Sequence, residues 1–370
     1  MADLLHFSRD TRVFLEQGSN IWEIPVLDGF SFSQATNATE ITLNEMSGSS
    51  GQSRRARQMF NDSFAPAEWS FSTYMKPHGT GAVEEALWAN FVSTSAYTAG
   101  GNSWSAGIGQ SGAAMTVDFN ESNVVTLGTY NLYFVLGASQ DSDVNYTSGT
   151  GVTIYKLTGC VGNSASIDFD IDGLATIAWS GFGTQITEEA SKNMGTPIRT
   201  GIDSNTNFIR NRLTTLGITA ADTTTFPGAS SNGVYNLVLT GGSLSFENNI
   251  TFITPETLGE VNLPAGHITG TRNISGNFTC YLNNGDAGGS ADLFEDMIEA
   301  TDIITNSFGL VFGIGGSAVP KVVVTCPTAH IETPTHSIED VISLEVNFHA
   351  LPSSVSSTNE ATIVYTGAGS

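Results

Sequence analysis

The most constraining feature of this sequence is an internal repeat. Residues 21–33, IWEIPVLDGFSFS, and residues 234–246, VYNLVLTGGSLSF, are alternating runs that pass through a glycine into a second alternating run. Residues 69–75, WSFSTYM, match residues 276–282, GNFTCYL, in the same way. Alternation with a period of two is typical of a half-buried strand, so each matching pair of segments predicts a pair of equivalent strands.

A short helical segment follows the second matching block at nearly the same distance in both places. Residues 84–92 read EEALWANFV, and residues 290–298 read SADLFEDMI. Apolar side chains recur at intervals of three and four residues, which is typical of an amphipathic helix. Acidic residues occupy the first turn, where the helix dipole favours them, and Ser290 is placed to cap the second helix.

The last matching block contains a stretch that looks like a calcium site. Residues 168–173, DFDIDG, place carboxylates at every second position before a glycine, as the start of an EF-hand loop does. The loop needs a bidentate carboxylate at its twelfth position, and that position is Trp179. In the second copy the first two acidic positions are Thr335 and Ser337. We therefore interpret the stretch as a strand that enters a turn and predict no metal site.

The repeats divide the chain into two copies of one β-rich unit. The first copy spans residues 1–195, the second spans residues 196–352, and residues 353–370 form a polar C-terminal tail. The first copy also carries a glycine-rich loop at about residues 98–112, which we interpret as a mobile surface loop. Short apolar runs separated by Gly, Ser, Thr and Asn are typical of β proteins with many turns. We expect a mainly β protein, a β-sandwich or barrel with one flanking α-helix per copy.

The composition and the motifs argue against an enzyme. The 370 residues carry 13 Lys and Arg against 36 Asp and Glu, a formal charge of −23 that disfavours binding to nucleic acid. Residues 107–112 fit a dinucleotide-binding glycine pattern, but no strand precedes them and no suitable helix follows. Cys160, Cys280 and Cys326 lack zinc-site spacing and are expected to be reduced and buried, with Cys160 and Cys326 facing each other in the alignment of the copies. We predict no catalytic residue and no cofactor.

One basic cluster interrupts the acidic sequence. Arg54, Arg55 and Arg57 lie within five residues, and in so acidic a chain we expect them to meet an acidic surface, including one on another copy of the chain. The first residues show no basic and apolar pattern of a secretory signal, and no apolar run is long enough to span a bilayer. These observations lead us to expect synthesis in a cytoplasm and no membrane association.

Several of these segments together resemble the tail tube proteins of tailed bacteriophages. The resemblance is carried by residues 22–34, WEIPVLDGFSFSQ, the arginine cluster, and residues 59–77, MFNDSFAPAEWSFSTYMKP, followed by a helix. Residues 248–258, NNITFITPETL, and residues 270–282, GTRNISGNFTCYL, look like the same family a second time. The resemblance implies a structural virion protein whose inner strands join around a ring into one barrel, and whose rings stack into a hollow conduit for DNA.

The resemblance also implies which residues join the rings. The hairpins at about residues 47–68 and 259–275 would be the inter-ring loops, with Arg54, Arg55 and Arg57 in the first and Arg272 in the second. A ring in this family ordinarily has six units. A chain with two units is then expected to close a ring of three chains with pseudo-sixfold symmetry; the alternative is six chains, each with one half projecting outward.

The expected partners follow from the same resemblance. They are the chain itself, the tape measure, tail terminator and baseplate proteins, and a sheath where the tail has one. DNA is expected to pass through a net negative bore without specific binding. The protein is expected in the virion tail after assembly in the bacterial host cytoplasm. The competing hypothesis is a tandem β-sandwich virion adhesin or tail decoration protein, which should differ most between its copies in exposed aromatic loops.

Overall fold

The protein is mainly β, as predicted, and contains two α-helices in its described residues. The computed structural model describes residues 5–42, 57–119, 126–137, 144–149, 151–257, 261–284, 287–300, 308–338 and 340–368. The N-terminal half contains β1 (Arg12–Gln17), β2 (Asn20–Ile24), β3 (Ser31–Ser33), β4 (Thr36–Thr42), β5 (Arg57–Phe64), β6 (Ala67–Tyr74), β7 (Pro77–His78), β8 (Gly81–Ala82), α1 (Glu85–Val92), β9 (Tyr97–Thr98), β10 (Ser103–Trp104), β11 (Ile108–Ser111), β12 (Ala114–Asp118), β13 (Tyr130–Leu136), β14 (Asn145–Thr147), β15 (Thr153–Phe169), β16 (Thr176–Gly183), β17 (Gln185–Glu188) and β18 (Ser191–Asn193). The C-terminal half contains β19 (Thr215–Ala220), β20 (Val234–Leu237), β21 (Leu239–Glu247), β22 (Thr251–Ile253), β23 (Gly266–Ile268), β24 (Asn273–Tyr281), α2 (Ser290–Glu299), β25 (Phe308–Ile314), β26 (Lys321–Ile331), β27 (Thr335–Ile338), β28 (Ile342–Ala350) and β29 (Thr362–Thr366). Short 3-10 helices span Ser8–Asp10, Ala99–Gly101 and Asn211–Leu213.

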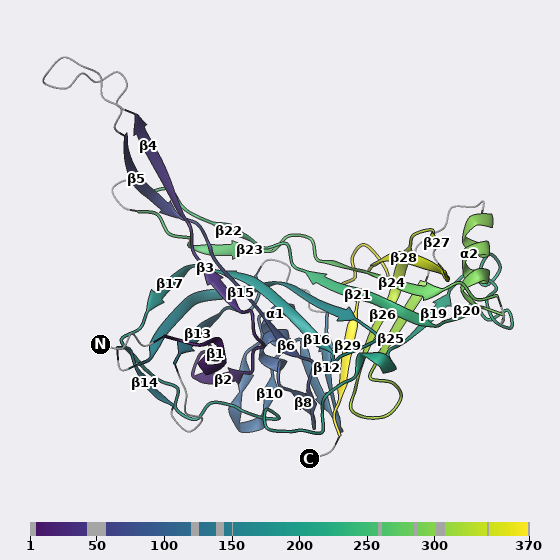
Figure 1. Ribbon diagram of the computed structural model, residues 1–370, viewed down its shortest axis with the longest axis horizontal. Coiled ribbons are helices and arrows are strands. Elements are labelled where there is room, and N and C mark those ends of the chain that lie inside the picture. The colour runs from purple at the N-terminus through teal and green to yellow at the C-terminus, as the bar shows by residue number, and fades with distance from the viewer. Residues whose placement is uncertain are drawn as a thin grey trace, which may run out of the picture.

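One antiparallel sheet runs through both halves, and we call it the long sheet. Its strand order is β3, β6, β16, β15, β21, β24 and β28, and β28 pairs in turn with the end of β26 and with β27. Phe71 lies opposite Trp179 on its buried face, and Ile167 of β15 lies opposite Leu244 of β21 where the two halves meet. Pairing of β15 with β21 thus makes the two halves one continuous sheet (Figure 1).

A second layer of strands covers the buried face of the long sheet. In the N-terminal half β2, β1, β13, the first part of β15 and β17 form this layer, and in the C-terminal half β20, β19, β25, the first part of β26 and β29 form it. Aromatic rings fill the space between the layers: Phe32 contacts Phe134 at 4.7 Å between ring centroids, and Phe312 contacts Phe348 at 5.5 Å. The alternating apolar residues of the repeat are therefore core residues.

The two helices differ in their surroundings. The helix predicted at residues 84–92 is present, but it is not amphipathic, because every residue of α1 is buried; α1 is enclosed by β15, β11 and β12. In α2 only one side is buried, as predicted. Ser290 does not cap α2, because its hydroxyl donates to the Tyr281 carbonyl and accepts the Asn283 amide, which ties the helix start to the end of β24.

Two segments that we interpreted from the sequence as a loop and a tail contain strands. Residues 98–112 include all of β10 and β11, and Trp104 stacks on Trp22 with ring centroids 5.3 Å apart. Within residues 353–370, β29 pairs with β26 on one edge and β12 on the other, and Tyr365 is fully buried. The C-terminal strand therefore belongs to this chain's own fold.

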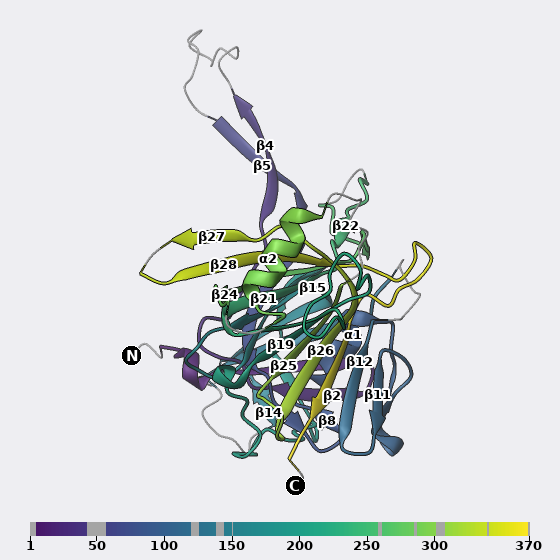
Figure 2. The same cartoon turned by 90° about the vertical axis from the view of Figure 1, so that its right-hand side faces the viewer.

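Two hairpins leave the same end of the long sheet. β4 and β5 follow β3 and precede β6, and they form a ribbon that projects from the body (Figures 1 and 2). β22 and β23 occupy the same place between β21 and β24. The second hairpin touches the base of the first, because the Phe64 amide donates to the Asn262 carbonyl at 2.9 Å and the Asn262 amide donates to the Asp62 carbonyl at 3.1 Å. Among the described residues, no helix has the length and apolar character needed to cross a membrane.

Candidate functional site

The face of the long sheet that points away from the core is the candidate functional surface. Along β6, β16, β28 and the last parts of β21 and β24, buried residues alternate with more exposed ones, so the period of two fixes which side chains lie on the outward face. Most of the side chains on this outward face are small hydroxyls and amides, which are half-buried or exposed. The set contains Ser31, Ser33, Ser70, Ser72, Ser164, Ser166, Thr176, Ser180, Ser243, Ser245, Ser275, Asn277, Thr279, Ser343 and Asn347.

These small polar side chains form rows across the strands. The Ser31 and Ser70 hydroxyls are 2.8 Å apart, and the row continues through Ser180 and Ser164 in register. In the C-terminal half the Ser243 hydroxyl donates to the Asn277 side-chain oxygen at 3.2 Å. Short hydroxyl side chains that bond to one another form a smooth, hydrated surface, and few of its side chains extend far enough to contact a ligand.

The charge of this surface is negative. Its carboxylates are Glu68, Asp168, Glu247 and Glu345, each from a different strand. None of β3, β6, β16, β21, β24, β27 and β28, nor the part of β15 that joins this sheet, contains Lys or Arg. His349 is the basic side chain on this face, and it lies 3.7 Å from a carboxylate oxygen of Glu332. Such a surface repels polyanions.

Both lateral edges of the long sheet are unpaired in the described part of the chain. β3 pairs only with β6, and β27 pairs only with β28. All four residues of β27 are exposed, as are Ser31 and Ser33 of β3. Open edges expose backbone donors and acceptors that can pair with another chain, so the sheet can be extended at both sides.

The predicted inter-ring arginines of the first hairpin lie on the projecting ribbon or beyond it. Arg57 begins β5 and is 68% exposed, with its guanidinium 3.3 Å from a Glu40 carboxylate oxygen across the ribbon. Arg54 and Arg55 lie outside the described residues. Met59 and Phe60 are also exposed on β5, so the ribbon carries apolar groups as well as a basic one.

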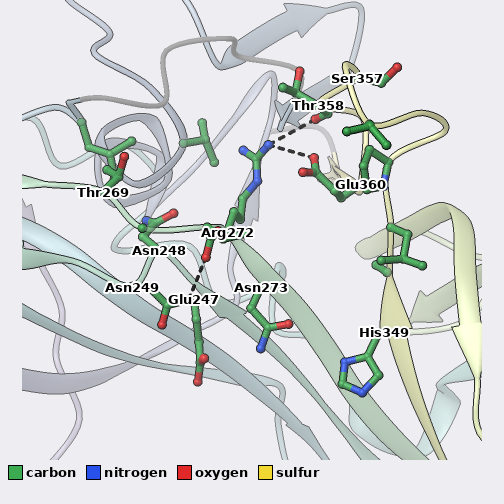
Figure 3. Close-up of a pocket in the computed structure, with 18 of the residues that line it drawn as sticks. Glu247, Asn248, Asn249, Thr269, Arg272, Asn273, His349, Ser357, Thr358 and Glu360 are labelled. Carbon is green, nitrogen blue, oxygen red and sulfur yellow. Dashed lines mark hydrogen bonds and ion pairs between the residues drawn. The ribbon is translucent and has the colours of Figure 1, made fainter.

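Arg272 has partners within its own chain. Its guanidinium bonds the Glu360 carboxylate at 2.8 Å and the Thr358 carbonyl at 3.3 Å (Figure 3). It also lies 5.5 Å from the centre of the Phe119 ring. The side chain is 17% exposed and lines an open pocket at the hairpin end of the long sheet. Arg272 thus fastens the segment that leads into β29, and its role between rings stays a prediction.

The comparison with known proteins decides the family. A family model described as phage tail tube protein matches residues 24–350. The chain belongs to the phage tail tube protein family. A curated relative, the tail tube protein pb6 of Escherichia phage T5, is 29% identical over 374 residues, which cover 96% of this chain and 75% of the relative. The resemblance drawn from the sequence is therefore confirmed, and the chain is a structural component of a phage tail.

Sequence reasoning missed the most distinctive surface of this tail tube protein. The polar face of the long sheet was not assigned, although its signal is present in WSFS and SLSFE, where Ser occupies every second position. Alternation alone identifies two faces for each strand. It does not tell which strands lie side by side, and only their pairing shows that the serines form one continuous surface.

Proposed function

We propose that the chain polymerises as stacked rings into the hollow phage tail tube and that the polar face of the long sheet lines the bore through which DNA is ejected. The observation that carries the proposal is this face: it has carboxylates on four strands, no Lys or Arg, and an open strand edge at either side. DNA phosphates are repelled by carboxylates, whereas cationic side chains would bind DNA by counterion release. A bore of this kind lets DNA pass without specific binding.

The pairing schemes of the two halves support a duplicated tube fold. β1 pairs with β2 and β13 as β19 pairs with β20 and β25; β6 pairs with β3 and β16 as β24 pairs with β21 and β28. A bulge interrupts both β13–β15 and β25–β26, beside Tyr130 and Phe308. In this correspondence Cys160, which lies opposite Tyr130, is equivalent to Ala329, which lies opposite Phe308. The sequence alignment of the two copies, which matched Cys160 with Cys326, therefore differs from the pairing by three residues.

We call the pairing of β15 with β21, where the two halves meet, the seam. We infer the contact between neighbouring chains from the seam. On one side of the seam, Leu244 pairs with Gly276 of β24, while Phe32 pairs with Trp69 of β6. Gly276 and Trp69 correspond in the repeat, so β3 of the N-terminal half is the counterpart of β21. In a ring, the free edge of β3 would occupy the position that β21 has in the seam.

The other side of the seam has a counterpart in β27. Ile167 of β15 pairs with Ile177, and His336 of β27 pairs with Leu344, where Ile177 and Leu344 correspond in the repeat. Ile167 lies opposite Leu244 in the seam. The equivalent contact between chains is antiparallel pairing of β27 with β3 of the next chain.

This contact favours a ring of three chains. Both halves contribute strands to one sheet, so each half fills one position of the bore and three chains supply six positions. In the alternative of six chains per ring, one half would project outward, and its strands would not be needed in the sheet that lines the bore. We propose the ring of three chains with pseudo-sixfold symmetry.

The further partners of the proposed tube are the tape measure protein in its lumen, the terminator and baseplate proteins at its ends, and a sheath where the tail has one. Assembly would take place in the host cytoplasm. Negative-stain imaging of the purified protein tests the proposal. Hollow tubes of stacked rings are the expected result, and isolated particles at every concentration and salt would contradict it.

A further inference from the structure

The seam shows how a helix of one half covers the side of the other half. Trp88 of α1 lies 5.6 Å from Phe246 of β21, measured between ring centroids. The Asn248 side chain, which directly follows β21, donates to the Phe91 carbonyl near the end of α1 at 3.0 Å. Trp88 and Phe246 are completely buried. α1 therefore contributes to the core of the C-terminal half, although its sequence belongs to the N-terminal half.

The equivalent side of the N-terminal half is not covered in the described part of the chain. In the repeat, Phe32 of β3 corresponds to Leu244 of β21, and Tyr155 of β15 corresponds to Val324 of β26. Leu244 and Val324 are completely buried, whereas Phe32 and Tyr155 are only partly buried, with their ring centroids 5.3 Å apart. Ile186 of β17, the strand next to Tyr155, is partly buried as well. We call Phe32, Tyr155 and Ile186 the open side of the N-terminal half.

α2 corresponds to α1, and its outer side is uncovered among the residues that the structure describes (Figure 2). In the repeat, Phe294 corresponds to Trp88 and Ile298 corresponds to Val92. Trp88 and Val92 are buried, whereas Phe294 is partly buried and Ile298 is 56% exposed. Residues 300–307, which separate α2 from β25, are too few to supply a counterpart of β11 and β12, which cover α1. The apolar stripe of α2 is therefore incompletely covered by its own chain.

We propose that α2 packs against the open side of the N-terminal half of the next chain in the same ring, as α1 packs against the C-terminal half within one chain. The inference rests on the proposed function. It names a second surface, besides the paired edges of β27 and β3, that joins neighbouring chains. In this contact Phe294 and Ile298 meet the open side, and apolar side chains that each chain leaves partly exposed become buried on both partners.

The positions of the two surfaces agree with a contact around a ring. Phe294 lies 4.3 Å from His336 of β27 between ring centroids, and His336 lies opposite the buried Leu344, so α2 is on the core side of the long sheet. Phe32 also points to the core, from the other edge strand, β3. Figure 1 shows α2 and β17 at opposite ends of the molecule. Pairing of β27 with β3 of the next chain therefore brings α2 to the open side, behind the bore face.

The end of α2 can make a polar contact of the kind that α1 makes in the seam. Thr36 corresponds to Asn248, because it follows Phe32 by the same number of residues as Asn248 follows Leu244. Met297 corresponds to Phe91, and its carbonyl is among the last four of the helix, which have no partner inside it. The Thr36 hydroxyl of the next chain is thus placed to donate to the Met297 carbonyl, as the Asn248 amide donates to Phe91.

Cross-linking between chains tests the contact. Chains carrying T36C and chains carrying I298C are mixed, assembled and treated with a short bismaleimide; the three native cysteines are buried and do not compete. The equivalent positions in the seam, Asn248 and Val92, line one pocket. We expect a cross-linked dimer from this mixture, and none when V311C, on the exposed side of β25, replaces I298C.

The double variant T36C/I298C distinguishes a contact within a ring from a contact between rings. Its cross-linked series should end at three chains, because the contact closes around the ring. A series that continues beyond the number of chains in a ring would place the contact between rings and contradict the proposal. Tubes that form without any T36C–I298C cross-link would overturn the contact and leave the proposed function standing. If the wild-type chain forms no tubes, both fail.

A charge placed on the apolar stripe gives a second, independent measurement. I298D should raise the protein concentration needed for tube formation by about tenfold or more, because an apolar contact would be replaced by a buried carboxylate. The isolated chain should unfold at the same temperature as the wild type, since Ile298 is exposed in it. I298L, which keeps the apolar side chain, and V311D, which changes an exposed apolar residue elsewhere, should assemble as the wild type does. Wild-type assembly by I298D would contradict the contact.

Discussion

The indole nitrogen of Trp88 in α1 donates a hydrogen bond to the hydroxyl of Tyr365 in β29 at 2.7 Å. Both side chains are completely buried, and 277 residues of sequence separate them. The bond fastens the C-terminal strand to the helix of the N-terminal half, in addition to the antiparallel pairing of β29 with β12. The halves are thus joined twice, once through the long sheet and once through β29.

We expect Y365F to destabilise the protein by about 1–3 kcal/mol, because the buried Trp88 N–H would lose its acceptor. The free energy of unfolding in urea measures the effect. T366V, a change in the same strand at a less buried side chain, should have a smaller effect. Equal stability of Y365F and wild type would show that the bond contributes nothing to the junction.

The carboxyls of Glu84 and Glu85 at the start of α1 predict a pH dependence of stability. Burial raises the pKa of each from 4.5 to about 7, although the Lys76 amide donates to Glu84 at 3.1 Å and partly opposes the rise. The unfolded chain ionises these groups near pH 4.5, whereas the folded chain keeps them protonated to about pH 7. Their contribution to stability is therefore greatest at low pH and is lost as the pH rises from 4.5 to 7.

The variant E84Q/E85Q should remove this dependence while its amides still accept hydrogen bonds. Relative to wild type, it should gain stability between pH 5 and pH 8, up to roughly 3 kcal/mol per group from the size of the pKa shift. Thermal unfolding at the two pH values measures the difference. An unchanged pH dependence in E84Q/E85Q would mean that these carboxyls are ionised in the folded protein.

Cationic side chains placed on the proposed bore should bind DNA. Ser166 and Ser245 are paired across the seam on the polar face, so S166K/S245K adds two positive charges to each chain there. We expect tubes of this variant to retain short duplex DNA at low salt and release it at high salt. Wild-type tubes, and tubes of T215K/T219K with the lysines on exposed positions of β19, should retain much less. Equal retention by the two lysine variants would argue against the assigned bore face.

The proposed pairing of β27 with β3 can be tested in a single variant. The register of the seam places Thr335 opposite Ser33 of the next chain, because Ser166 lies opposite Ser245 within the chain. Oxidised S33C/T335C should therefore give cross-linked species that end at three chains, whereas S33C alone should give none. A series that ends at six chains would support the alternative ring, and absence of cross-links in assembled tubes would refute the register.

The sequence predicted those parts of the fold that have a strong local pattern. Alternation located the paired strands around Phe71 and Trp179, and the three-and-four spacing located both helices. The cover of α1 by β11 could not be predicted, because β11 is short and lies in a glycine-rich stretch without a clear period. The same holds for β29, whose TIVYT run is too short to distinguish a buried strand from a tail.

The candidate site was predictable in its chemistry but not in its place. The acidic composition indicated a negative surface, and the polar face does carry carboxylates without Lys or Arg; the negative bore and the charged contact between copies stay predictions. The polar face became visible only from the pairing of strands far apart in sequence, such as Ser164 with Glu247. Arg272 was predicted from the family resemblance to join rings. In the structure its guanidinium forms an ion pair with Glu360 of the same chain, which could not be predicted from the sequence.

A three-dimensional reconstruction of the assembled tube from electron micrographs tests the central claim most directly. The account predicts three chains per ring, six sheet units around the bore, and Ser70, Ser166, Ser245 and Glu345 facing the lumen. Six chains per ring with one half of each projecting outward, or a lumen lined by Lys and Arg, would contradict it.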